Sequence, residues 1–125
     1  MSENELSFII RGCIFKVHKK LGPGLLESVY QMALVEELRL EGLEVDEQVP
    51  IGVVYLDKEQ EIGFKLDILV ENKVVIEIKS VEILLDVHHR QLITYLKLSG
   101  MKLGLLVNFN VPKVSTAIFR KVNNL

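Results

Sequence analysis

The sequence predicts an α/β or α+β fold in which helices pack around a central mixed sheet. Apolar residues recur at helical spacing over residues 4–20, 25–41 and 86–99, whereas the period changes to two between residues 44 and 79. Residues 102–109 are almost continuously apolar, as expected of a strand that is buried on both faces. Helices at both ends of a run of strands are typical of layers built on one sheet.

Turn residues separate these elements. Gly22-Pro23-Gly24 divides the first two helices, and Gly42 and Gly100 are the expected ends of the second and third. Four strands are predicted before the third helix, at residues 44–49, 51–56, 62–70 and 74–79, with turns at Pro50, residues 57–61 and Glu71-Asn72-Lys73. Residues 113–122 fit either a last strand or a short helix.

Length and composition indicate one globular domain over residues 1–125, with 49% hydrophobic and 26% charged residues. The net charge of −2 divides into +1 for residues 1–35, −7 for residues 36–61 and +4 for residues 62–125, so a polyanion could meet the first and last segments. The single cysteine, Cys13, allows no disulfide within the chain, and the amino terminus lacks the features of a signal peptide. We therefore expect a cytoplasmic protein with no membrane partner.

The stretch IEIKS, residues 76–80, places an acid and a base in an otherwise apolar strand. With a three-residue turn at 71–73, opposed residues have numbers that add to 144, so Asp67 lies across from Glu77, and Lys79 shares the face of Glu77. The other face is expected to point into one core, and its residues are Phe64, Leu66, Ile68, Ile76 and Ile78.

Two opposed carboxylates repel each other, and a divalent cation such as Mg²⁺ would offset that repulsion. A neighbouring lysine could orient an attacking water, which is the chemistry of phosphodiester hydrolysis. The alternative is a surface ion pair between Asp67 and Lys79, since acids and lysines alternate on the wet faces of many strands. The apolar character of residues 74–79 argues that this face is not broadly solvated.

Two further groups of residues share helix faces. Gly24, Glu27 and Tyr30 are spaced by three, and Gln91 and Tyr95 by four. An acid in a first turn and an amphipathic surface are the ordinary explanations for both groups. The adjacent histidines 88 and 89 point about 100° apart on a helix and cannot readily share a metal, so a zinc site is not expected. The chain contains no GxGxxG, no P-loop and no GxSxG motif.

Taken together, these stretches resemble the GxxExxY protein family, a branch of the PD-(D/E)XK nuclease superfamily. The resemblance rests on LGPGLLESVY (21–30), EELRLEGLEV (36–45), FKLDILVENKVVIEIKS (64–80), HHRQLITYLKLSG (88–100) and LGLLVNF (103–109). It implies a restriction-endonuclease-like core, with a mixed sheet of about four strands flanked by helices.

The resemblance also implies a role for each matching position. Asp67 and Glu77 would bind Mg²⁺, with Mn²⁺ as an alternative, and the backbone carbonyl of Ile78 would complete the ligands. Lys79 would act on the attacking water. Glu27 would supply a further acid and a possible metal ligand.

Gln91 would match the glutamine that follows the motif lysine on a helix, and Tyr95 the aromatic residue four positions later. We assign substrate positioning to Tyr30, Tyr95 and Arg90. Basic residues that could contact phosphates are Lys16, Lys19, Lys20, Arg90, Lys97, Lys113, Arg120 and Lys121.

The sequence thus predicts a Mg²⁺-dependent nuclease-like protein that hydrolyses DNA or RNA. The alternative is a catalytically silent module of the same fold that binds nucleic acid or a partner protein. A third possibility is a structural interaction module with a vestigial site. A homodimer is a possible assembly, because so small a domain has little surface with which to grip a duplex.

Overall fold

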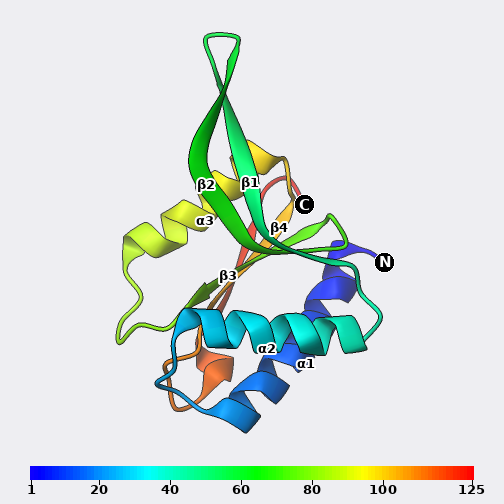
Figure 1. The fold of residues 1–125 in the computed structure, drawn as a ribbon, viewed down its shortest axis with the longest axis vertical. Coiled ribbons are helices and arrows are strands. Elements are labelled where there is room, and N and C mark those ends of the chain that lie inside the picture. The colour runs from blue at the N-terminus through cyan, green and yellow to red at the C-terminus, as the bar shows by residue number, and fades with distance from the viewer.

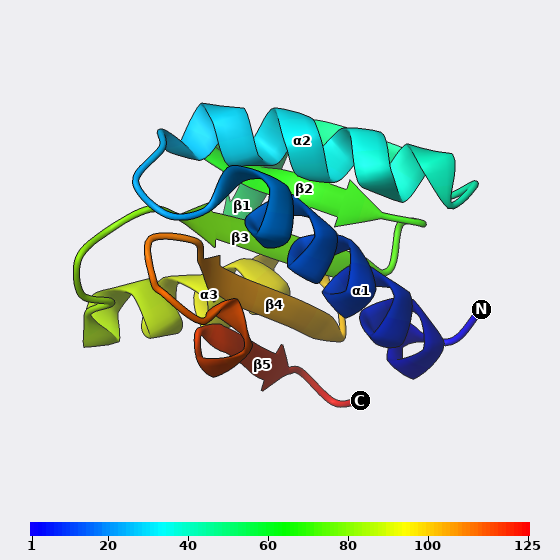
Figure 2. The same ribbon diagram turned by 90° about the horizontal axis from the view of Figure 1, so that it is seen from below.

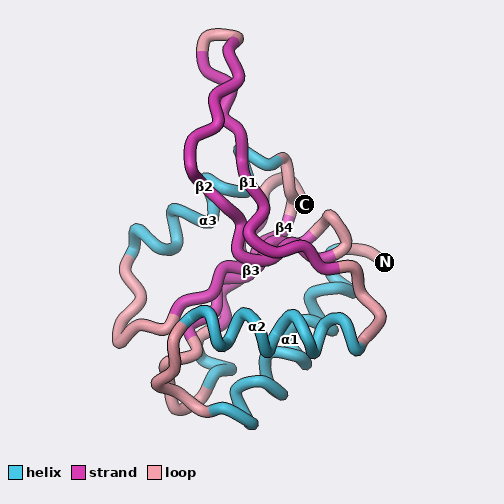
Figure 3. The backbone as a smooth tube through the Cα atoms, viewed as in Figure 1, coloured by secondary structure: helices cyan, strands magenta, loops and turns pink.

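The computed structural model describes the backbone of residues 1–125 and all side chains except those of Glu61 and Ile62. The described backbone (Figures 1 and 3) forms three α-helices, five strands and one short 3₁₀ helix. In chain order these are α1 (Glu3–Leu21), α2 (Glu27–Leu40), β1 (Val45–Tyr55), β2 (Lys58–Val70), β3 (Val74–Lys79), α3 (Asp86–Ser99), β4 (Leu103–Asn108), η1 (Val114–Thr116) and β5 (Ile118–Val122).

The strands form one mixed sheet in the order β1-β2-β3-β4-β5. β3 and β4 are parallel, and every other neighbouring pair is antiparallel. Because parallel strands need a long crossover connection, α3 fills the segment between β3 and β4. The mixed sheet flanked by helices is confirmed, whereas its five described strands correct the expected number of about four.

Two helices cover one face of the sheet and the third covers the other (Figure 2). The α1/α2 core combines the apolar stripes of α1 and α2 with Ile68, Ile76 and Ile78. The α3 core combines Leu92, Tyr95 and other residues of α3 with the opposite side of the sheet. The three helices predicted from periodicity are therefore present, each with its apolar stripe buried.

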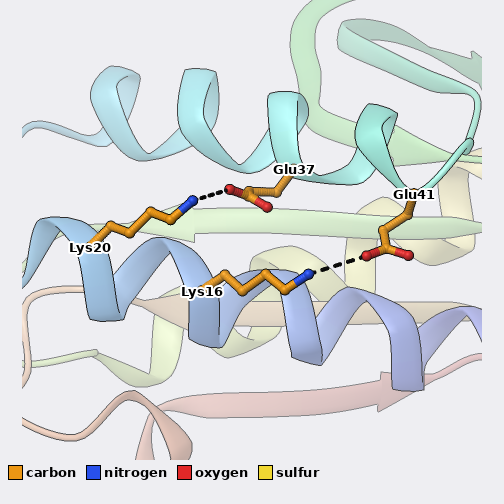
Figure 4. A network of polar contacts seen from close by, with 4 residues as sticks. All are labelled: Lys16, Lys20, Glu37 and Glu41. Carbon is orange, nitrogen blue, oxygen red and sulfur yellow. Dashed lines mark hydrogen bonds and ion pairs between the residues drawn. The ribbon is translucent and has the colours of Figure 1, made fainter.

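Two ion pairs connect α1 with α2 and its C-terminal end. Lys20 Nζ lies 2.8 Å from Glu37 Oε1, and Lys16 Nζ lies 3.2 Å from Glu41 Oε1 (Figure 4). Both lysines are more than half exposed, so solvent screens each pair and its contribution to the stability of the fold is small. Lys16 and Lys20, two of the residues that could contact phosphates, thus also pair with acids of the neighbouring helix.

The long hairpin of β1 and β2 corrects two predicted turns. Pro50 does not divide β1, which runs from Val45 to Tyr55, because an edge strand tolerates a residue that cannot donate a ladder hydrogen bond. The predicted turn at residues 57–61 is also wrong. Tyr55 pairs with Lys58 across a two-residue turn in which Leu56 and Asp57 have φ of 51° and 59°. Those dihedrals match a type I′ turn, and the hairpin projects beyond the body of the molecule (Figure 1).

The predicted single core face of β2 is wrong as well. Ile68 packs in the α1/α2 core, but Leu66 packs in the α3 core. The Phe64 ring lies beside that of Tyr95, tilted by 51°, with ring centroids 5.7 Å apart. β2 therefore exchanges its two faces between Leu66 and Ile68. The residue between them is Asp67.

β1 exchanges faces at the matching position. Val45 belongs to the α1/α2 core, whereas Val49 and Ile51 pack with the α3 core. The residue before Val49, Gln48, has a φ of 48°, a conformation uncommon for a residue with a side chain. The register of the two strands skips Gln48 and Asp67, with Glu47 paired to Ile68 and Val49 to Leu66. The two strands thus reverse their facing together at one kink.

The end of the chain contains both structures that the sequence left open for residues 113–122. Val114–Thr116 form η1, and Ile118–Val122 form β5 against β4. Among the helices of the described chain, none is both long and apolar enough to cross a membrane.

Candidate functional site

The register of β2 and β3 places Asp67 beside Glu77. The paired residues Ile68–Ile76, Leu69–Val75 and Val70–Val74 follow the predicted register around the three-residue turn. The next opposed residues are Asp67 and Glu77. At this point hydrogen bonds from backbone amides to side-chain carboxylates take the place of backbone–backbone hydrogen bonds. The Asp67 amide donates a hydrogen bond to Glu77 Oε1 at 3.1 Å, and the Ile78 amide donates one to Asp67 Oδ2 at 2.8 Å.

The kink in β1 supplies a further contact to this pair. Gln48 Nε2 lies 3.4 Å from Asp67 Oδ1 and donates a shorter hydrogen bond, 2.8 Å, to Gln31 Oε1 of α2. No sequence pattern predicts a role for Gln48, because its unusual φ accompanies the kink at which β1 and β2 exchange faces. The Asp67 carboxylate is therefore held by β3 on one side and by β1 on the other.

Glu77 is nearly buried, with 5% of its surface exposed. Burial raises the pKa of Glu77 to about 9, and the negative charge of Asp67 adds to this rise. The hydrogen bond from the Asp67 amide and the positive charge of Lys79 act in the opposite direction. Without a cation, the Glu77 carboxyl is therefore neutral at pH 7.

Lys79 lies at the end of β3 on the face of Glu77. Val75 packs in the α3 core, and alternation puts residues 77 and 79 on the same face. Lys79 is partly buried and pairs across the sheet with Asn108 of β4. The positively charged side chain of Lys79 thus lies two residues along β3 from the nearly buried Glu77, on the face of the sheet that α3 covers.

α3 brings Tyr95 and Gln91 to this face. Tyr95 is 7% exposed, and burial raises the pKa of its hydroxyl, with the negative charges of Glu77 and Asp67 contributing further. A hydrogen bond with the Gln91 side chain lowers that pKa. Arg90 points elsewhere: its guanidinium is exposed and lies 3.5 Å from Asp86 on the same helix. The structure therefore brings Tyr95 and Gln91 to the acid pair and leaves Arg90 at the helix surface.

The G-x-x-E-x-x-Y segment fixes the loop before α2. Gly24 has a φ of 94°, which favours glycine. The Tyr30 hydroxyl donates to the Gly22 carbonyl at 2.5 Å and accepts from the Leu25 amide at 3.2 Å. The Tyr30 ring is fully buried and stacks on Phe109, with centroids 4.5 Å apart. This burial gives Tyr30 a role in shaping the loop and corrects the substrate contact assigned to it.

Glu27 and Ser80 join that loop to the end of β3. The Ser80 hydroxyl donates to the Leu25 carbonyl at 2.5 Å, and the Ser80 amide lies 3.4 Å from Glu27 Oε1. Sequence reasoning assigned no role to Ser80, although it closes the IEIKS stretch. Glu27 therefore lies next to Ser80, the residue that follows Lys79.

Asn108 closes the same end of the sheet. It is 3% exposed, its Nδ2 donates to the Val81 carbonyl at 2.9 Å, and its Oδ1 accepts from the Val81 amide at 3.1 Å. A polar residue at the end of an apolar strand was the available sequence signal for this contact. Asn108 fixes the start of the loop that leads from β3 to α3.

The donor set fits a divalent cation in its chemistry but is small. Asp67 and Glu77 offer hard carboxylate oxygens of the kind that Mg²⁺ prefers, and a cation would relieve the repulsion that raises the pKa of Glu77. Among the side chains that the structure describes, no three acids, histidines or cysteines converge closely enough to hold a metal. Glu27 thus does not complete a three-acid group in this arrangement.

A model of the PD-(D/E)XK nuclease superfamily matches residues 4–121. The chain belongs to this superfamily. The mixed five-stranded sheet between α1 and α2 on one side and α3 on the other is consistent with its restriction-endonuclease-like fold. No curated protein and no solved structure matches the chain. Nucleases of this superfamily typically use divalent metals, and membership suggests a nuclease-like function and nucleic-acid binding.

Proposed function

We propose that residues 1–125 form one Mg²⁺-dependent nuclease domain of the GxxExxY type, which hydrolyses phosphodiester bonds in DNA or RNA. The observation that carries the proposal is the acid pair at the open end of the β2–β3 ladder. The Asp67 amide donates to the Glu77 carboxyl, the Ile78 amide donates to the Asp67 carboxylate, and Lys79 follows on the face of Glu77. A structural sheet would gain more from two apolar residues at these positions.

The side chains divide the work as follows. Asp67 and Glu77 would hold the cation together with the backbone carbonyl of Ile78, and the bound Mg²⁺ or Mn²⁺ would stabilise negative charge on the phosphate. Lys79 would donate a hydrogen bond that orients the attacking water. The oxygen of that water would form the new P–O bond while the P–O bond to the leaving oxygen breaks, and the proton that the water loses would pass through solvent to the leaving oxygen.

The surrounding groups would set the shape of the site. Tyr95 and Gln91 exclude water from one side of the acid pair, and Glu27 beside Ser80 would bind a metal-bound water or a second ion. Tyr30 acts indirectly, because its two hydrogen bonds place the loop that carries Glu27. A cytoplasmic location agrees with the free thiol of Cys13.

A catalytically silent module that binds nucleic acid or a protein is the second candidate. It is favoured by the donor set, because the described side chains bring only two acids together and Glu27 bonds to a backbone amide instead. A buried acid pair with one neutral member is stable without a metal. The two candidates differ in whether the pair binds a cation.

Calorimetric titration with Mn²⁺ and a cleavage assay on mixed DNA and RNA, each on wild type and Asp67→Asn, separate the candidates. Asp57→Asn is the matched control, because it makes the same change at the exposed hairpin turn, where a φ of 59° suits asparagine. We expect binding and cleavage to survive in the control and to vanish in Asp67→Asn. Binding without cleavage would support the metal site and point to a missing partner or a different substrate. Absence of binding at millimolar Mn²⁺, with nucleic acid present, would refute the metal site and favour the silent module.

A further inference from the structure

The outer face of α1 exposes aromatic side chains on a helix that has already buried an apolar stripe. Leu6, Ile10 and Ile14 on the inner stripe are completely buried. On the opposite side, Phe8 is 80% exposed and Phe15 is 43% exposed. An amphipathic helix that packs on one core needs only one such stripe. A second apolar stripe in water is typical of an interaction surface.

The spacing on this outer face is symmetric. Phe8 and Phe15 are two turns apart and point within about 20° of each other, because seven residues nearly complete two turns. Gly12 lies between them on the same side, and a Cβ built there would meet nothing within 4 Å. The face therefore consists of two aromatic side chains on either side of Gly12, where the missing side chain allows another helix to approach closely.

The charges of this face complement those of a second, antiparallel copy. Glu5 lies in the first turn of α1 and Lys19 in the last, and both are exposed. They stand seven residues before and seven residues after Gly12. If two α1 helices cross antiparallel at Gly12, Glu5 of each copy meets Lys19 of the other, and Phe8 of each lies near Phe15 of the other. The helix dipoles also oppose each other in this arrangement.

We propose that the outer face of α1 (Glu5, Phe8, Gly12, Phe15 and Lys19) is a homodimer interface, with a two-fold axis beside Gly12. The contact is isologous, because the same surface serves both copies. It includes Lys19, one of the residues that could contact phosphates, but none of the residues around Asp67 and Glu77, so it goes beyond the proposed nuclease function and does not depend on it. One helix face is smaller than a standard interface, so we expect a weak dimer whose population depends on protein concentration.

Sedimentation velocity over the micromolar to millimolar range tests this interface on wild type, Phe8→Asp and Leu40→Asp. Leu40 is the matched control, because it is 81% exposed and lies on α2, outside the face. We expect a monomer–dimer equilibrium in wild type and Leu40→Asp, and a monomer in Phe8→Asp with an unchanged circular dichroism spectrum. A monomeric wild type, or a Phe8→Asp variant that still dimerises, would overturn the proposal.

A disulfide tests the position of the axis independently. Gly12→Cys places a thiol where the two helices cross, within the distance of about 7 Å that a disulfide allows between Cα atoms. We expect rapid covalent dimers under mild oxidation, whereas Leu40→Cys forms them slowly. The native Cys13 is 1% exposed and does not interfere. Equal rates for the two variants would rule out an axis at Gly12.

Discussion

Gly104 of β4 is predicted to be irreplaceable even by alanine. A Cβ at this position would lie 2.9 Å from Cδ1, 3.1 Å from Cδ2 and 3.1 Å from Cγ of Leu92. Optimal separation between carbon atoms is about 3.5–4.0 Å, so three atoms would be in steric conflict at once. Leu92 belongs to α3 and is fully buried against the sheet, so neighbouring side chains restrict its movement away from the added methyl group. We expect Gly104→Ala to lower the free energy of unfolding by about 1–3 kcal/mol through overpacking.

A double-mutant cycle with Leu92→Ala isolates this contact. Leu92→Ala alone leaves a cavity and should cost about 2–5 kcal/mol. In that background the methyl group that Gly104→Ala adds enters the vacated space, so this second substitution should then cost little. The two changes together are therefore predicted to be less destabilising than their sum by about 1–3 kcal/mol.

Urea unfolding followed by far-ultraviolet circular dichroism measures all four corners of the cycle. Gly63→Ala is the control, because it makes the same substitution in β2, where a Cβ would meet nothing within 4 Å. The unfolding slope m should stay constant, so that midpoints report stability alone. A Gly104→Ala variant as stable as the Gly63→Ala control, or strict additivity in the cycle, would refute the close approach of α3 to β4. That approach also places Gln91 and Tyr95, which flank Leu92 on the same helix.

Three further outcomes follow from single side chains. Tyr30→Phe removes two hydrogen bonds to the loop before α2 and should cost about 1–3 kcal/mol in urea unfolding, whereas Tyr55→Phe at the exposed hairpin should cost nothing measurable. Burial raises the pKa of the Cys13 thiol from 9.0 to about 11. A disulfide reagent at about pH 8 should therefore modify the unfolded chain and spare the folded one. Because the thiolate is disfavoured in the folded state, the contribution of Cys13 to stability is complete below pH 9.0 and is lost as the pH rises toward 11. Fast modification of the folded protein would contradict the burial of this residue. Asn108→Ala leaves the backbone of Val81 without its two bonds and should raise amide exchange in the loop that follows β3 before it affects the rest of the sheet.

Local patterns predicted most of the architecture. The three helices, the strand after α3 and the register of β2 with β3 all follow from periodicity and turn residues. Pro50 misled the strand assignment because its missing donor matters only in a central strand, and the place of β1 at the edge is a property of the whole sheet. The same holds for residues 57–61, whose polar character suits an exposed hairpin as well as a loop.

The sequence predicted that Asp67 and Glu77 lie side by side, but it did not predict the arrangement of the residues around them. The pairing of Asp67 with Glu77 needed only the turn at residues 71–73. The burial of Tyr30 agrees with the helical spacing, which puts this residue on the core side of α2 together with Leu34 and Leu38. It depends on Phe109, which lies far away in the chain and stacks on it.

The kink at Gln48 and Asp67 explains why this position suits a polar site. In a continuous ladder the amides of Asp67 and Ile78 would donate to backbone carbonyls. Strict alternation would also keep each β2 side chain on the face that its position in the strand dictates. Because both strands exchange faces here, the ladder opens and those two amides bond to carboxylates instead. The bonds orient the acids and partly offset the cost of burying them together. The sheet thus confines two acidic groups at a point where its own hydrogen bonding is interrupted, and either a cation or a proton on Glu77 must balance them.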